Sequence, residues 1–247
     1  QLAEKTAKAV TGSVEEWTDF LQSAARLYKY SYPEQLLIYA QRPDATACAS
    51  YEIWNQTMRR YVRRGARGIA LPDGAGAVRY VFDVADTGAR KSSREVKTWV
   101  LDENNREAVA HALETQYGSA AKLGIAGQLE EIAMQQSMDY WQWHQDELRG
   151  IVDGSFLEGY DELNLEIAFR NTAAASVKYM LLSRCNLARE YQIEPEELAG
   201  VLEWNTSAAS GALGSAISEL SEGVLRQIER TIRQYERSQN HDERTDV

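Results

Sequence analysis

The chain has 247 residues, of which 44% are apolar and 26% charged, and its formal net charge is −10. This is the composition of an ordinary globular protein, long enough for one large domain or two small ones. Its apolar runs fall far short of the ~20 residues of a membrane span, so no membrane partner is expected. No basic-then-apolar signal segment leads the chain, which starts at Gln1 and is expected to be a piece of a longer protein.

The cysteines and the charge distribution indicate the cellular compartment and the organisation of the chain. Cys48 and Cys185 are too few and too far apart for a disulfide framework or a zinc knuckle, and predict buried free thiols in a reducing, cytoplasmic compartment. Residues 1–100 carry 15 Lys and Arg against 11 Asp and Glu, a net charge of +4. Residues 101–247 carry 12 against 26, a net charge of −14. This asymmetry predicts two regions with different surfaces.

Three helices are predicted in the first part of the chain. Ser13 and Glu16 form a capping-box pattern ahead of an amphipathic helix. Pro33 opens a second, shorter helix, since proline costs nothing at a first helical position. Residues 50–64 (SYEIWNQTMRRYVRR) predict a third helix, which Gly65 would end.

Strand patterns follow, and then the pattern becomes helical. GIALP (68–72) and VRYVFDV (78–84) flank the turn sequence DGAG, and VKTWVL (96–101) follows after a polar loop. From about residue 104 onward the clearest helical patterns are 126–146, 162–184, 196–204 and about 212–237. The predicted fold class is therefore α+β, with a small antiparallel sheet and helices first and a mostly helical region second.

This pattern predicts three parts: an N-terminal domain over residues 1–103, a helical domain over residues 104–239, and the start of a linker at residues 240–247. The linker is expected because the last residues are polar and uncapped.

Arginines crowd one short stretch of this acidic chain. Arg59, Arg60, Arg63 and Arg64 would share one face of the predicted helix, and Arg67 follows closely. Arginines in a last turn complement the helix dipole, which gives a purely structural explanation. Like charges four residues apart also repel, however, and guanidinium groups match phosphate geometry. The stretch therefore predicts contacts with nucleic-acid phosphates.

Two further residues are weaker candidates for the same role. Lys29 and Tyr30 lie in a run rich in tyrosines just before the arginine stretch. A basic track beside aromatic faces is typical of proteins that bind single strands. The alternative is that these tyrosines belong to the core, with their hydroxyls hydrogen-bonded.

The arginine stretch also carries a family resemblance. V-R-R-G-A-R-G-I at 62–69, preceded by Trp54, is similar to the motif of the N-terminal domain of ArdC-type antirestriction proteins. More broadly, LYKYSYPEQLLIYAQRPDATACA, RYVRRGARGIAL, YVFDVADTG and IVDGSFL resemble the N-terminal region of large helicase/methyltransferase-like proteins on conjugative elements of Firmicutes. The resemblance implies a domain that binds single-stranded DNA, carried on a mobile element.

ArdC-type proteins also have a zinc-metallopeptidase-like domain with an HExxH helix. IAFRNTAAASVKYMLLSRCNL resembles a later helix of that domain, but the HExxH motif is missing. The three histidines are His111, His144 and His241, and none has a second histidine four residues on. The resemblance therefore implies a degenerate peptidase-like region without catalytic zinc, and no cofactor is expected.

The sequence thus predicts a non-catalytic DNA-binding module, preferably for single strands, that lies beside further domains of the same polypeptide. Any helicase or methyltransferase activity would lie beyond Val247. Two alternatives stay open: a protein-binding antirestriction module that uses the acidic second region, and a metal-dependent hydrolase with an atypical site.

Overall fold

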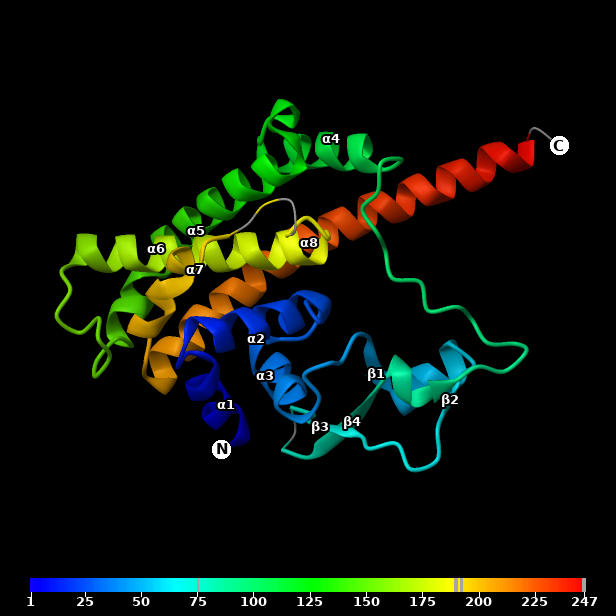
Figure 1. The fold of residues 1–247 in the computed structure, drawn as a ribbon, viewed down its shortest axis with the longest axis horizontal. Coiled ribbons are helices and arrows are strands. Elements are labelled where there is room, and N and C mark those ends of the chain that lie inside the picture. The colour runs from blue at the N-terminus through cyan, green and yellow to red at the C-terminus, as the bar shows by residue number, and fades with distance from the viewer. Residues whose placement is uncertain (75, 189–190, 192, 246–247) are drawn as a thin grey trace.

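The chain folds into a helical body and a smaller sheet lobe, which lies to one side of it (Figure 1). The computed structural model describes residues 1–74, 76–188, 191 and 193–245, with side chains up to residue 239. The helices are α1 (Leu2–Val10), α2 (Val14–Arg26), α3 (Tyr32–Gln41), α4 (Arg106–Tyr117), α5 (Gly124–Gly150), α6 (Glu162–Arg184), α7 (Pro195–Leu198) and α8 (Ser207–Thr245). The strands are β1 (Cys48–Ser50), β2 (Tyr61–Val62), β3 (Ile69–Pro72), β4 (Val78–Asp83) and β5 (Thr87–Gly88). The α+β fold class is confirmed.

Local signals set several helix starts. The Ser13 hydroxyl accepts the Glu16 N–H at 3.1 Å, so the predicted cap of α2 is present. Pro33 lies in the first turn of α3, which starts one residue earlier at Tyr32. Helix α8 is longer than predicted and continues through most of the expected linker at residues 240–247; the last two of those residues lie outside the described part of the chain.

The main core joins both halves of the chain. Helix α6 packs along α5 and also against α2 and α8. The Trp17 indole of α2 is fully buried and donates to the Ser176 hydroxyl of α6 at 3.0 Å. The Tyr32 ring of α3 lies against Gly214 of α8. Helices α1 to α3 therefore share a core with residues beyond the expected domain boundary at residue 103.

The sheet lobe comprises β1 to β5. Its main sheet is antiparallel with strand order β1-β4-β3, and β2 pairs with β5 separately. The predicted hairpin is confirmed, because β3 pairs with β4 in the register Ile69↔Val81. Ile69 and Val81 join Leu27 and Ile38 in a second, smaller hydrophobic cluster under α3.

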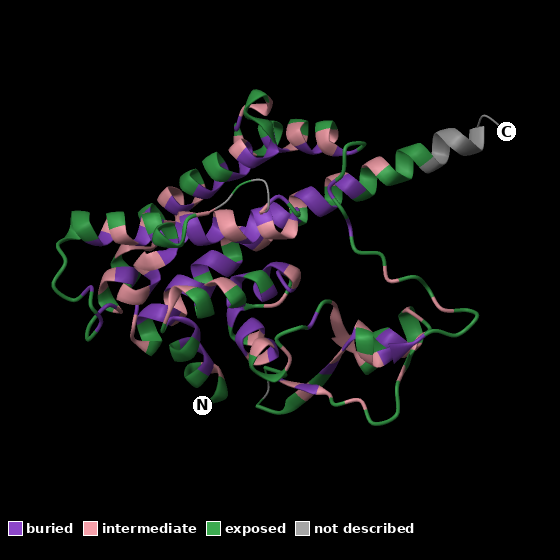
Figure 2. Cartoon of the chain, viewed as in Figure 1, coloured by how far each residue is buried: buried purple, intermediate pink, exposed green. Residues whose placement is uncertain are grey.

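The segment that returns from the lobe to the body is called the connector (residues 89–105). It runs along the periphery of the molecule, and Figure 2 shows most of it exposed. The strand predicted at 96–101 is wrong, because these residues pair with no strand in the described part of the chain. Trp99 and Leu101 do alternate with exposed Val100, but they insert into the core of the helical body.

Two other element predictions need correction. The helix predicted at 196–204 is α7 followed by a 3-10 helix, η4 (Ala199–Glu203). The helix predicted at 50–64 ends early, in a short π-helical turn, η1 (Ile53–Thr57). The second correction moves the arginines, as described next.

Candidate nucleic-acid interface

The arginine segment (residues 59–67) is not helical, so the shared helix face predicted for its arginines does not exist. Arg59 has a φ of 54°, in the left-handed region, and strand β2 begins two residues later. Strand β2 pairs with β5 in the register Tyr61↔Gly88. Repulsion between arginines four residues apart works against a helix, and this long-range pairing stabilises an extended backbone instead.

Trp54 fixes the turn that precedes the segment. Its side chain is 3% exposed, and its indole N–H donates to the Phe82 carbonyl of β4 at 2.8 Å. Its own carbonyl accepts the Arg60 N–H at 2.8 Å. The tryptophan thereby ties the arginine segment to the main sheet.

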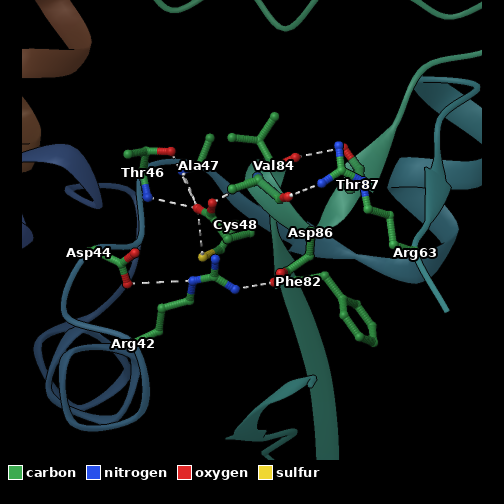
Figure 3. Close-up of polar contacts among 12 residues, drawn as sticks. Arg42, Asp44, Thr46, Ala47, Cys48, Arg63, Phe82, Val84, Asp86 and Thr87 are labelled. Atoms are coloured by element: carbon green, nitrogen blue, oxygen red, sulfur yellow. Dashed lines mark hydrogen bonds and ion pairs between the residues drawn. The ribbon is translucent and has the colours of Figure 1, made fainter. Parts of the chain in front are cut away.

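Two of the arginines are held by groups of the neighbouring segment 84–88. The Arg60 Nε donates to the Thr87 hydroxyl at 2.8 Å. The Arg63 side chain donates to the Ala85 carbonyl at 3.2 Å, and its backbone N–H donates to the Asp86 carbonyl at 2.8 Å (Figure 3). These contacts orient both guanidinium groups without neutralising them, since the acceptors are uncharged.

The other three arginines are exposed. Arg67 lines a pocket of about 470 Å³ together with Arg42 and Asp44, which follow α3. Arg59 and Arg64 make no side-chain hydrogen bond within the described residues. Across the described chain, none of the five arginines forms an ion pair with a carboxylate.

Two aspartates at the end of β4 and in the turn after it are engaged within the chain (Figure 3). Asp83 is 1% exposed and accepts the backbone N–H groups of Thr46 and Ala47 at 2.7 and 3.0 Å. Asp86 pairs with the Arg42 guanidinium, and this contact raises the pKa of Arg42. The sheet lobe therefore uses its acids for internal contacts, and the arginine segment keeps its positive charge.

The connector adds more positive charge beside the segment. The Ser93 hydroxyl donates to the Arg59 carbonyl at 2.6 Å, and the Arg94 N–H donates to the Met58 carbonyl at 2.9 Å. Residues 59–97 contain ten Lys and Arg against four Asp and Glu, a net charge of +6. The cations that sequence reasoning missed are Arg90, Lys91 and Arg94, because DTGARKSSRE read only as a polar loop.

Lys29 and Tyr30 lie apart from the arginine segment. The Lys29 ammonium pairs with Glu229 of α8 at 2.6 Å. The Tyr30 hydroxyl donates to the Cys48 carbonyl at 2.8 Å, and burial raises the pKa of Tyr30. Both residues line the same cleft at the edge of the helical body. Both side chains are engaged within the chain.

Aromatic side chains of the sheet lobe do face solvent. Tyr51, Tyr61 and Tyr80 are 51%, 42% and 55% exposed. Tyr61 belongs to β2, inside the arginine segment, and the Arg90 guanidinium lies 5.7 Å from its ring centroid. The exposed aromatic surface of the lobe is therefore supplied by these three tyrosines rather than by the run at 28–39, and Tyr61 lies next to a cation of the connector.

Metal-binding groups do not converge in the part of the chain that the structure describes. No cluster of three or more His, Cys, Asp or Glu side chains suited to a metal occurs there. His144 stacks on Tyr140 with ring centroids 4.1 Å apart, and the side chain of His241 lies outside the described residues. Both cysteines are free thiols; Cys185 is buried and Cys48 half-buried, and burial raises the pKa of each to about 12. Among the described helices, none is both long and apolar enough to span a bilayer.

Comparisons with known protein families, with curated proteins and with solved structures give no match for this chain. The resemblance to ArdC-type proteins therefore stays a prediction.

Proposed function

We propose that this chain is a non-catalytic DNA-binding module, with a preference for single strands. Arg59, Arg60, Arg63, Arg64 and Arg67 contact backbone phosphates, and Arg90, Lys91 and Arg94 of the connector extend the surface. Consistent with the ArdC-type resemblance, the module works in the cytoplasm beside further domains of a mobile-element protein.

The observation that carries this proposal is uncompensated charge. Five guanidinium groups lie within nine residues, and across the described chain no carboxylate pairs with any of them. Such crowding is unfavourable for folding alone, because like charges repel. A polyanion removes the repulsion, and guanidinium forks bind phosphate oxygens in a bidentate manner. Arg60 and Arg63 are already oriented by Thr87 and Ala85, which reduces the entropy lost on binding.

The exposed tyrosines support the preference for single strands. Bases of a single strand can stack on aromatic side chains, with about 1–3 kcal/mol per base, whereas paired bases cannot. Tyr61 and Tyr80 are large exposed aromatic residues of the sheet lobe.

A salt series tests the phosphate contacts. A triple variant, Arg59→Gln with Arg64→Gln and Arg67→Gln, removes three exposed cations that form no side-chain hydrogen bond or ion pair with the described residues. Binding to a labelled oligothymidylate should lose about two units of salt slope, at ~0.7 per phosphate contact. A matched control, Lys5→Gln with Lys8→Gln and Lys122→Gln, removes the same charge from exposed positions of the helical body and should keep the slope. Equal slopes in the two triple variants would contradict the proposal.

A second test separates stacking from charge. Tyr61→Ala and Tyr80→Ala should each weaken binding of the single strand several-fold and leave a duplex of the same sequence unaffected. Equal weakening of both substrates would argue against stacking and leave only phosphate contacts.

One observation favours the protein-binding alternative. A pocket of about 500 Å³ between α5, α6 and α7 is lined by Glu130, Glu196, Glu197 and Glu203, and Lys178 is the cation among its described lining residues. Such a surface attracts a basic partner. If the oligonucleotide fails to bind at low salt while a basic DNA-binding protein binds the chain, and Glu196→Gln with Glu203→Gln abolishes this, the alternative replaces the main proposal.

A further inference from the structure

A cleft lies where the connector meets the helical body, apart from the arginine segment. Two adjoining pockets of about 400 and 200 Å³ form it, between connector residues 96–101 and the ends of α2 and α6, with α8 alongside. The residues that line both pockets are Arg26, Thr46, Thr98, Trp99 and Arg184.

The cleft is strongly positive. Its charged lining consists of Arg26, Lys29, Lys97, Arg184 and Arg233, with Glu229 as the carboxylate. Glu229 is already satisfied, because it binds Lys29 at 2.6 Å and Arg233 at 2.8 Å. Arg26 and Arg184 are left facing the cleft without an ion pair in the described part of the chain.

Arg184 is held in place by Trp99. Its guanidinium lies 3.5 Å from the centre of the Trp99 ring and donates to the Trp99 carbonyl at 3.1 Å. Burial lowers the pKa of Arg184, so the fold works against its charge. A guanidinium group has five N–H donors. Within the described residues, Arg184 uses one of them, in the bond to the Trp99 carbonyl.

Arg26 approaches the same cleft from the end of α2. It donates to the carbonyls of Ala45 and Pro43 at 3.0 and 2.9 Å, which leaves donors of the same group unused. Burial lowers the pKa of Arg26 as well. The carboxylates of Asp44 and Asp83 favour the charge of Arg26 without forming an ion pair with it. Among the described residues, these two half-buried guanidinium groups thus line one cavity with spare donors and no ion-paired carboxylate, and an anion bound there would relieve the cost of burying them.

We propose that the cleft at Arg26 and Arg184 binds a phosphate group. The phosphate can come from a DNA strand or from a free nucleotide, because both offer the same oxygens. The connector favours a strand, since its cations at Arg90, Lys91, Arg94 and Lys97 lead along the chain from the arginine segment to the cleft. If the phosphate belongs to a DNA strand, the cleft is a second DNA-binding site and rests on the proposed function.

Wild-type protein gives the first test. In a ¹H–¹⁵N spectrum of the 247-residue chain, thymidine monophosphate should shift the Nε–H signals of Arg26 and Arg184 and the indole signal of Trp99, with one saturable affinity. Thymidine without phosphate should shift none of them. Unmoved arginine signals at saturating nucleotide and at saturating oligothymidylate would overturn the proposal without any variant.

Variants give the second test. Arg184→Gln and Arg26→Gln should each weaken phosphate binding about ten-fold or more, as expected for a lost charged hydrogen bond. Arg184→Lys keeps the charge and should lose less. Arg170→Gln is the control on the same helix, because Arg170 pairs with Glu166 outside the cleft and should leave affinity unchanged. Equal affinity in Arg184→Gln and Arg170→Gln would refute the site.

One comparison distinguishes a DNA strand from a free nucleotide as the source of the phosphate. The same comparison distinguishes the cleft proposal from the proposed function. A free-nucleotide site predicts that monophosphate binding needs Arg184 but not Arg59, Arg64 and Arg67. If the phosphate belongs to a DNA strand, oligothymidylate binding should weaken both in Arg184→Gln and in the arginine-segment triple variant. If only the arginine-segment triple variant loses the oligonucleotide, the cleft proposal fails and the proposed function stands. If only Arg184→Gln loses a phosphate ligand, the cleft proposal stands and the proposed function fails.

Discussion

Glu229 on α8 carries the sharpest prediction about stability. Its side chain is 10% exposed and accepts the Tyr28 hydroxyl at 2.5 Å, with Lys29 and Arg233 completing its contacts. Burial by itself would raise the pKa of this carboxyl. The hydrogen bonds from Lys29, Tyr28 and Arg233 outweigh burial and lower the pKa from 4.5 to about 2. Because Tyr28 also accepts the Trp99 indole N–H at 3.1 Å, Glu229 helps to hold the connector.

The depressed pKa sets both the size and the pH range of the effect. At 1.36 kcal/mol per pKa unit, a fall from 4.5 to about 2 stabilises the folded state by about 3 kcal/mol at neutral pH. Solvent screens part of this, since Lys29 and Arg233 are 45% and 43% exposed, so we expect about 2 kcal/mol. A carboxyl with a lowered folded-state pKa stabilises fully above its unfolded pKa. The contribution is lost as pH falls from 4.5 toward 2.

Glu229→Gln should therefore lower the free energy of unfolding by about 2 kcal/mol at pH 7, measured by urea denaturation. The deficit should shrink between pH 5 and pH 3, as the wild-type carboxyl loses its advantage. Glu222→Gln is the matched control on the same helix, because Glu222 pairs with Arg226 at the surface, where such a pair contributes about 0.3–0.5 kcal/mol. A loss in Glu229→Gln no larger than in this control, or one independent of pH from 5 to 3, would refute the reasoning.

Three packing predictions follow, each measured by chemical denaturation. Gly214→Ala should lower the free energy of unfolding by about 1–3 kcal/mol, because its new methyl group would collide with the Tyr32 ring. Gly211→Ala is the control on the same helix: its methyl group meets open space, and it should raise the free energy of unfolding by up to about 1 kcal/mol. Tyr32→Phe should stabilise by about 1 kcal/mol, since its buried hydroxyl has no hydrogen-bond partner among the described residues. Gly88→Ala should displace the Tyr61 ring and with it β2, which lowers stability and weakens oligonucleotide binding without a change of charge; unchanged binding would separate β2 from the interface.

Local signals allowed part of the fold to be predicted. The cap at Ser13 and Glu16, the helix opening at Pro33 and the hairpin from Ile69 to Val81 all depend on residues close together in the sequence. Caps and tight turns are decided by such neighbours, so sequence patterns suffice for them.

The errors arose where distant residues decide the conformation. The helix predicted at 50–64 fails because Trp54 binds the Phe82 carbonyl and Tyr61 pairs with Gly88. The strand predicted at 96–101 fails because Trp99 has its partners in α6 and at the end of α2. An alternating pattern shows which side chains are buried and leaves open whether a neighbouring strand exists.

The sequence predicted the positive charge of the candidate site, but it did not predict the site's three-dimensional arrangement. Five arginines in nine residues indicate a cationic segment whatever conformation the chain adopts, although the sequence did not show that Arg60 would be half-buried. The cleft depended on topology, because Arg26 and Arg184 are far apart in the sequence and meet only through the packing of their helices on the connector. No spacing rule brings such a pair together.

The connector links the two positive surfaces mechanically as well as electrostatically. At one end, Ser93 and Arg94 bond to the backbone of Met58 and Arg59, so the connector helps to shape the arginine segment. At the other end, Trp99 lies under Arg184 and bonds to Tyr28. A phosphate bound at Arg184 would add a contact at the point where Trp99 anchors the connector to the helical body, and the connector is bonded in turn to the arginine segment. Occupation of the cleft should therefore strengthen binding at the segment, and by thermodynamic linkage the reverse holds by the same factor.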